Sequence, residues 1–80
     1  MSQRNIGNVI DKIIEVIPEQ EDCRESLVTR LKELKRQAAY AAPERIGVKW
    51  NKLGAILLNE LGKEVDKPWQ QTISDIMTGK

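Results

Sequence analysis

The chain has 80 residues, of which 40 % are hydrophobic and 31 % are charged, and its 13 basic residues nearly balance its 12 acidic ones. This length fits a single domain covering residues 1–80, and the hydrophobic fraction is too high for a disordered chain. The net charge of +1 gives no global sign of nucleic-acid or membrane binding. No stretch approaches the roughly 20 apolar residues of a membrane helix, and charged residues interrupt the N-terminal segment where a signal peptide needs an apolar core.

The first predicted helix covers residues 5–16. Its branched aliphatic residues recur at steps of three and four, which places on one face Ile6, Val9, Ile10, Ile13, Ile14 and Ile17. Asn5 or Ser2 is the expected N-terminal cap, and Pro18 disfavours helical geometry at Ile17 and so ends the helix. The apolar face spans well over about 100°, which is wider than one neighbouring helix requires. We therefore expect it to contact either two helices of its own domain or a helix of another chain.

The second predicted helix covers residues 22–40. Asp22 followed by Glu25 has the spacing of a capping box, and acidic residues at this end suit the positive end of the helix dipole. A narrow apolar stripe predicts the buried side of this helix and comprises Cys23, Leu27, Leu31, Leu34 and Ala38.

The third predicted helix begins near Pro43, which is favourable in a first turn, and ends at Leu61, before a closing Gly62. Its apolar face comprises Ile46, Trp50, Leu53, Leu57 and Leu61, and Ile56 and Leu58 widen that face on both sides. Gly47 and Gly54 each cost about 1 kcal/mol relative to Ala inside a helix, so we expect them to permit close packing, or Gly47 to delay the helix start. The width of the apolar face predicts the central helix of the fold.

The fourth predicted helix covers residues 67–78, with Asp66 and Pro68 as the start signal and Gly79 as the stop. Its apolar face comprises Trp69, Ile73, Ile76 and Met77. The four segments together predict an all-α fold, a small four-helix bundle with the third helix at its centre.

The segment AAYAAP, residues 38–43, connects the second helix to the third. Its alanines are small enough to let another backbone approach closely, and Pro43 breaks the helix. We predict that Tyr40 is the one large side chain that anchors this corner. The alternative interpretation is that Tyr40 contacts a ligand or a partner protein.

The sequence contains few residues in patterns typical of catalytic sites. It has no histidine, which removes the commonest general base and the commonest metal ligand, and its five glycines form no phosphate-binding loop. Cys23 is a candidate nucleophile, but its place on an apolar stripe among acidic neighbours predicts a buried structural cysteine instead. Glu60, Glu64 and Asp66 straddle a predicted helix end, where a solvated turn is favoured over a metal site. We therefore predict no catalytic residues, no cofactor and no metal.

The middle of the chain is basic, whereas its two ends are mildly acidic. If the corner brings the second and third helices together, their basic residues form a patch that suits phosphates or an acidic protein. The alternative is a pair of ordinary solvated faces, and the Ala-Ala-Pro corner does not fit the short Gly-containing turn of a helix-turn-helix. The residues of the predicted patch are Arg30, Lys32, Lys35, Arg36, Arg45, Lys49 and Lys52.

Trp50 and Trp69 both lie on predicted apolar faces, so we expect them in the core. A chain this short buries only about 60 % of the surface that its unfolded form exposes. Part of a tryptophan side chain then stays exposed, and tryptophan is enriched among the residues that anchor interfaces. Trp69 is therefore a second candidate contact residue.

These observations favour a non-enzymatic binding module that acts through protein–protein contact, of the adaptor or inhibitor type found in bacteria and phages. Its partner is another protein or a second copy, because small domains often gain stability by self-association. The runner-up is binding of an anionic ligand, a nucleic acid or a nucleotide, by the basic patch on the second and third helices. The single Cys23 excludes an intramolecular disulfide and suits a reducing compartment, so we expect a cytoplasmic protein.

Overall fold

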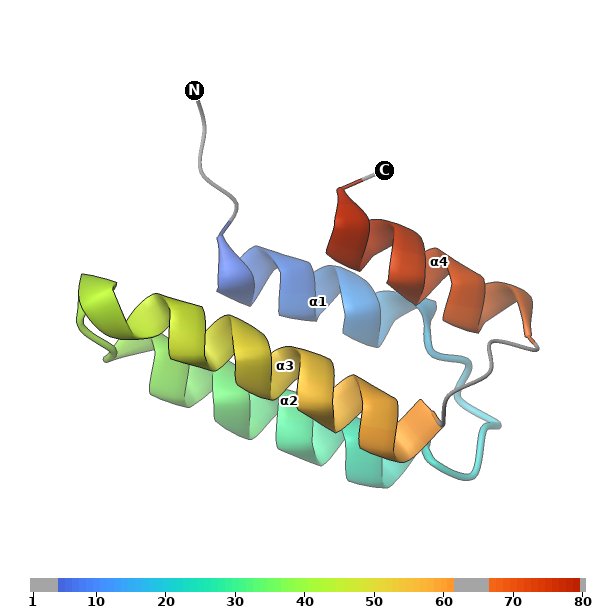
Figure 1. Ribbon diagram of the computed structural model, residues 1–80. Coiled ribbons are helices and arrows are strands. Elements are labelled where there is room, and N and C mark those ends of the chain that lie inside the picture. Colours follow the sequence, from blue (N-terminus) through green and yellow to red (C-terminus); the bar gives the residue numbers. More distant parts are fainter. Residues whose placement is uncertain (1–4, 62–66, 80) are drawn as a thin grey trace.

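A computed structural model describes residues 5–61 and 67–79 (Figure 1). The described residues form four α-helices: α1 (Ile6–Val16), α2 (Arg24–Ala39), α3 (Ile46–Leu61) and α4 (Pro68–Thr78), with a short 3₁₀ helix η1 (Pro43–Arg45) directly before α3. No strand occurs in these ranges. The prediction of a small all-α helical bundle is therefore confirmed.

Helix α1 begins at the predicted cap. The Asn8 backbone N–H donates a hydrogen bond of 3.1 Å to Oδ1 of Asn5, which satisfies one of the amides that a helix start leaves unpaired. The helix ends at Val16, and Ile17 takes an extended conformation before Pro18, as expected of a residue that precedes proline. The alternative cap, Ser2, lies outside the described residues.

Helix α2 begins later than its capping signal predicts. Cys23 occupies the N-cap position without a side-chain capping bond, so the capping box expected from Asp22 and Glu25 does not form. The chain reaches this point through two consecutive turns, in which Glu21 N–H donates to the Pro18 carbonyl and Arg24 N–H to the Glu21 carbonyl. These turns delay the first helical residue to Arg24.

Helix α4 follows its predicted signals. Pro68 occupies the first helical turn, and the Lys67 backbone N–H donates a hydrogen bond of 3.2 Å to Oε1 of Gln70. Gly79 ends the helix with φ of 81°, a left-handed conformation that glycine adopts without steric cost. The expected stop at Gly62 and start at Asp66 fall outside the described residues.

The core lies between α1 and its two neighbours. α1 packs against α2 on one side and α4 on the other, and α2 packs in turn against α3 (Figure 1). Both faces of the wide α1 stripe are thus covered within the domain, and Ile10 and Ile13 are fully buried. Of the two expectations for α1, contact with two helices of its own domain is the one that the structure supports.

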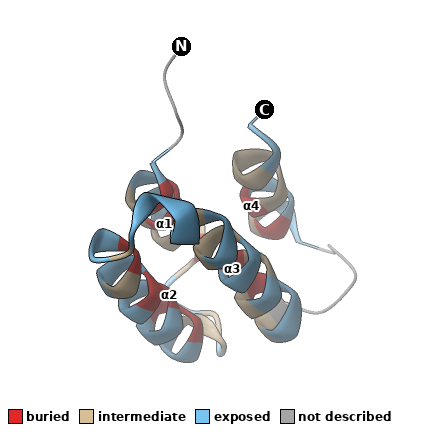
Figure 2. Cartoon of the chain, turned by 60° about the vertical axis from the view of Figure 1, so that its left-hand side comes forward, coloured by how far each residue is buried: buried red, intermediate tan, exposed pale blue. Residues whose placement is uncertain are grey.

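Helix α3 does not lie at the centre, contrary to the prediction. Among its residues with described side chains only Leu53 and Leu57 are buried, and Trp50 and Ile56 pack against the core from the edge. Leu58 is 55 % exposed, because it lies on the side of α3 that faces away from α2. Figure 2 shows exposed residues along this outer side of α3 and buried residues on the inward sides of the helices.

The packing predicts that substitutions at two adjacent residues of α2 change the free energy of unfolding by very different amounts. Leu31 is fully buried, so the Leu31→Ala variant should lower the free energy of unfolding by about 2–5 kcal/mol. The matched variant at exposed Lys32, Lys32→Ala, should change it by less than about 0.5 kcal/mol. Urea unfolding followed by circular dichroism measures both, and equal losses would contradict this arrangement of the core.

Candidate interaction surfaces

Three basic side chains of the predicted patch pair with carboxylates on three different helices. Lys35 Nζ lies 2.8 and 2.9 Å from the carboxylate oxygens of Asp11 on α1. Arg30 Nη1 lies 3.1 Å from Glu60 Oε1 on α3. Arg36 instead pairs with an acidic residue one turn back on α2 itself. These side chains therefore do not converge on one surface, and each has a carboxylate beside it.

A groove between α2 and α3 brings together part of the predicted patch. It has a volume of about 370 Å³, and Arg30 and Lys52 line it from opposite helices, together with Glu33 and Ile56. Lys52 is exposed and, within the described residues, has no acidic side chain within ion-pair distance. Of the remaining patch residues Lys32 and Arg45 are exposed and Lys49 is half-buried.

Glu33 adds negative charge to the same groove. The Arg36 guanidinium, and after it the Gln37 amide, donate hydrogen bonds that hold the pKa of Glu33 below its ordinary value. Glu33 therefore remains ionised at neutral pH. The α2–α3 groove combines both signs of charge, which fits a mixed polar surface better than a dedicated phosphate site.

The exposed side of α3 includes an uncharged strip, which exposed Lys52 borders on the side of the α2–α3 groove. We call this strip the α3 outer face and define it as Gly47, Val48, Asn51, Gly54, Ala55, Leu58 and Asn59, all exposed except the half-buried Gly54. Val48 is 50 % exposed and Leu58 55 %. The charged residues of α3 are on its other flank, where Lys52 lines the groove and Glu60 pairs with Arg30. A solvent-facing helix side normally concentrates charge, so this surface is unusual for a chain that is 31 % charged.

The glycines of α3 do not have the role that the sequence predicts. Apart from its own helix backbone and chain neighbours, a Cβ atom added at Gly47 or Gly54 would meet no atom of the described residues within 4 Å. The described part of the domain therefore shows no close packing at either glycine. The alternative concerned the start of the helix at Gly47, and α3 begins one residue before it, at Ile46, after η1. Sequence reasoning missed the outer face because it assigned Leu58 to the apolar face that it expected to be covered. The signal was present in the spacing of Lys49, Lys52 and Glu60, which fall on one flank of the helix.

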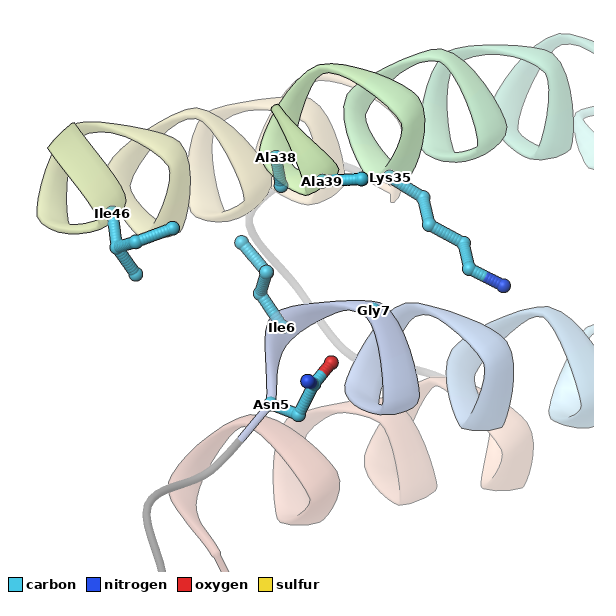
Figure 3. A pocket seen from close by; sticks show the side chains of 7 residues that line it. All are labelled: Asn5, Ile6, Gly7, Lys35, Ala38, Ala39 and Ile46. Atoms are coloured by element: carbon cyan, nitrogen blue, oxygen red, sulfur yellow. The ribbon is translucent and has the colours of Figure 1, made fainter. Parts of the chain in front are cut away.

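Tyr40 does not anchor the corner, since its side chain is 85 % exposed. It follows the last residue of α2, and the corner is instead built from small and aliphatic residues. Ala38 is buried, and it lines a pocket of about 410 Å³ together with Ile6 and Ile46, which come from α1 and α3 (Figure 3). Contact between Tyr40 and a partner remains a prediction.

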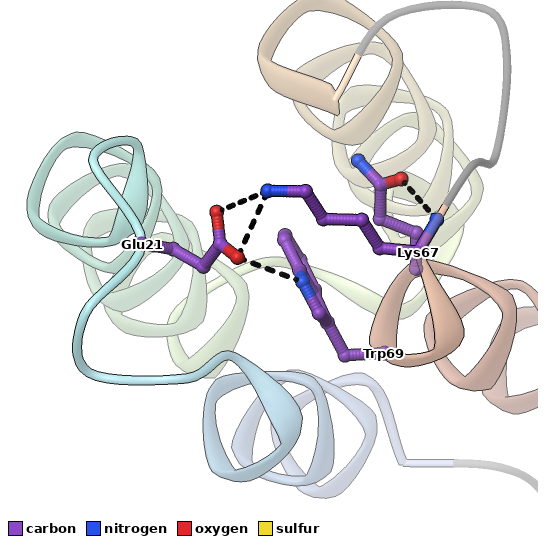
Figure 4. Close-up of polar contacts among 4 residues, drawn as sticks. Glu21, Lys67 and Trp69 are labelled. Carbon is purple, nitrogen blue, oxygen red and sulfur yellow. Dashed lines mark hydrogen bonds and ion pairs between the residues drawn. The ribbon is translucent and has the colours of Figure 1, made fainter.

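Contacts within the domain hold the Trp69 side chain in place. Its half-buried ring packs against the core, and its Nε1–H donates a hydrogen bond of 3.3 Å to Oε1 of Glu21 in the α1–α2 connection. Lys67 Nζ lies 2.7 and 2.9 Å from the same carboxylate, so α4 is held at its start by two donors (Figure 4). Trp50 packs against the core in the same half-buried way. Both tryptophans thus pack against the core from its edge and are half-buried, whereas the sequence predicts them inside it.

The described residues include no group of three or more potential metal-ligating side chains, and two members of the acidic trio considered above, Glu64 and Asp66, lie outside them. Cys23 is half-buried and forms no disulfide. None of the described helices is both long and apolar enough to cross a membrane. Comparison of the chain with protein-family models, with curated proteins and with solved structures finds no match.

The cluster in Figure 4 predicts how stability depends on pH. The hydrogen bond from Lys67 lowers the pKa of Glu21, against a smaller opposing effect of burial, so the folded state binds this proton less readily than the unfolded state. The interaction therefore stabilises the fold at neutral pH, and this stabilisation is lost as the pH falls below about 4.3, the ordinary pKa of glutamate.

The Glu21→Gln variant should accordingly unfold at lower urea concentration than the wild type at pH 7, and the difference should shrink in acid. Glu19→Gln, at an exposed position in the same connection, is the matched control. Equal urea midpoints for the two variants at both pH values would show that Glu21 does not hold α4 in place.

Proposed function

We propose that this chain is a small non-enzymatic binding module of the adaptor or inhibitor type, which acts through protein–protein contact at the α3 outer face. The observation that supports this proposal is the α3 outer face, an uncharged strip in which Val48 and Leu58 are half exposed to water. The cores of protein interfaces are depleted in charged residues, as this surface is.

The energetic argument follows from the exposed area. Full burial of a valine or leucine side chain contributes about 1.5–3 kcal/mol. Covering the exposed halves of Val48 and Leu58 would therefore contribute roughly 1 kcal/mol each. Beside them, the amides of Asn51 and Asn59 can donate and accept hydrogen bonds. Such bonds would fix the orientation of a partner on an otherwise apolar surface.

The edge of this surface is charged in a way that suits an interface rim. Lys52 lies one turn from both Val48 and Ala55, between the outer face and the α2–α3 groove. Polar and charged residues at such a rim mainly govern association rate and orientation. The single Cys23, half-buried and without a disulfide, supports a reducing compartment, and we propose the cytoplasm.

The alternative is anionic-ligand binding in the α2–α3 groove. The observation that favours it is the presence of Arg30 and Lys52 on opposite walls of that groove. Binding of nucleic acid through such cations weakens steeply as salt rises, whereas an apolar contact does not. A labelled single-stranded oligonucleotide titrated at two salt concentrations, with Lys52→Gln as the variant, separates the two functions.

Capture from native lysate tests the main proposal. The tagged wild type should retain a protein partner after nuclease treatment and in high salt, and Leu58→Glu should lose it, because the substitution places a carboxylate on the apolar contact. Lys32→Glu, which introduces the same carboxylate at an exposed site on α2, is the control and should retain the partner. Loss of all capture after nuclease treatment would favour the anionic-ligand alternative, and retention by Leu58→Glu would contradict the role of the α3 outer face.

A further inference from the structure

Helix α4 lies at one edge of the bundle. Among the described helices it packs mainly against α1, on the side that faces away from α2 (Figures 1 and 2). The two other main helix interfaces, α1 with α2 and α2 with α3, do not include α4. Separation of α4 from α1 would therefore leave both of those interfaces in place.

α4 also buries fewer apolar side chains than the two helices at the centre of the core. Ile73 is its one buried apolar residue, and Trp69, Ile76 and Met77 are half-buried. α1 and α2 each bury at least four apolar side chains. Apolar burial is the dominant favourable contribution to folding, so separation of α4 costs less free energy than unfolding of α1 and α2.

Two side chains at the start of α4 share one acceptor outside this helix. Glu21, in the α1–α2 connection, accepts hydrogen bonds from Lys67 Nζ at 2.7 and 2.9 Å and from the Trp69 indole at 3.3 Å (Figure 4). Separation of α4 from α1 would break these bonds. Glu21 therefore stabilises the closed position of α4.

The side of α1 that α4 covers follows from the position of Asp11. Asp11 pairs with Lys35 of α2, so it marks the α2 side of α1. Successive helix residues are rotated by about 100°, which places Val9, Ile13 and Val16 roughly 140–160° around the helix from Asp11. Val9 and Ile13 are buried, and Val16 is half-buried. We call these three residues the α1 flank, and α4 is the helix that packs on this side.

We infer that α4 is a releasable cover for the α1 flank, and that Glu21 holds this cover closed. In the open state α4 separates from α1 as one unit, whereas α1, α2 and α3 stay packed together. The open state exposes an apolar surface that the closed structure hides. This surface is separate from the α3 outer face, so the inference does not depend on the proposed function.

Hydrogen exchange of the full chain, followed by NMR, measures the opening. Amides that exchange only on global unfolding share the largest free energy of opening, and amides of a unit that opens separately share a smaller one. After correction for intrinsic rates, the amides of residues 73–77 should exchange at least about tenfold faster than the slowest amides of α2. Equal rates in the two helices would overturn the inference. Rates that rise residue by residue toward Thr78 would also overturn it, because they indicate fraying of the helix end.

Two variants show which contacts break in the open state. Glu21→Gln weakens contacts that are lost both in the open state and on global unfolding. It should therefore speed exchange in α4 and α2 by the same factor, about two- to fivefold. Ile56→Ala removes packing between α3 and α2 that the open state keeps. It should speed exchange in α2 about three- to tenfold and leave exchange in α4 unchanged.

The opposite results would contradict the inference. Equal acceleration of α4 and α2 by Ile56→Ala would show that α4 opens only with the whole domain. Unchanged α4 exchange in Glu21→Gln would show that Glu21 does not hold the cover closed. Glu19→Gln, at an exposed position in the same connection, is the matched control and should change neither helix.

Thiol labelling tests the exposure of the α1 flank. In a Cys23→Ser background, Val9→Cys places a thiol on the flank, and Ala38→Cys places one on α2. Val9 and Ala38 are equally buried, and Ala38 lines a pocket with residues of α1 and α3. The thiol of Val9→Cys should react with a thiol reagent at least about tenfold faster than that of Ala38→Cys, because only the former is uncovered when α4 opens. Equal labelling rates would show that the α1 flank stays covered and would overturn the inference.

Discussion

The structure depends on burial of the apolar face of α1. Ile10 and Ile13 are fully buried there, and a face this wide requires a neighbour on each side, which α2 and α4 provide. α3 then packs on α2 through Leu53 and Leu57 at the edge of the same core. None of the other described helices covers the outer side of α3. The exposed outer face of α3 is thus a consequence of how the four helices share one small core.

The ion pairs lie around this core and link its elements. Asp11–Lys35 joins α1 to α2, Glu60–Arg30 joins α3 to α2, and Glu21–Lys67 joins the α1–α2 connection to the start of α4. Exposed pairs of this kind typically contribute only about 0–1 kcal/mol each. Their main effect is on the surface: they place a carboxylate beside cations that would otherwise be free to bind a phosphate.

Local signals in the sequence predicted the helices well. Proline, glycine and Asn5 act on the backbone within a few residues, so the ends of α1 and α4 follow directly from them. The neighbours of each helix are decided at longer range. Leu57 and Leu58 are adjacent and chemically alike, yet one is 8 % exposed and the other 55 %, because only one points toward α2 and the core. Tyr40 and Gly54 were misread for the same reason: their surroundings depend on where other helices pack.

The edge position of α3 leaves part of its apolar pattern uncovered. A helix that is apolar on more than one side is usually buried on more than one side. α3 has such a pattern, with Leu53 and Leu57 toward α2 and with Val48 and Leu58 away from it. Within one copy only the first pair is covered. A partner bound at the α3 outer face, as proposed above, would cover the second pair. The wide apolar pattern that made α3 look central in the sequence therefore includes residues that its own domain leaves exposed.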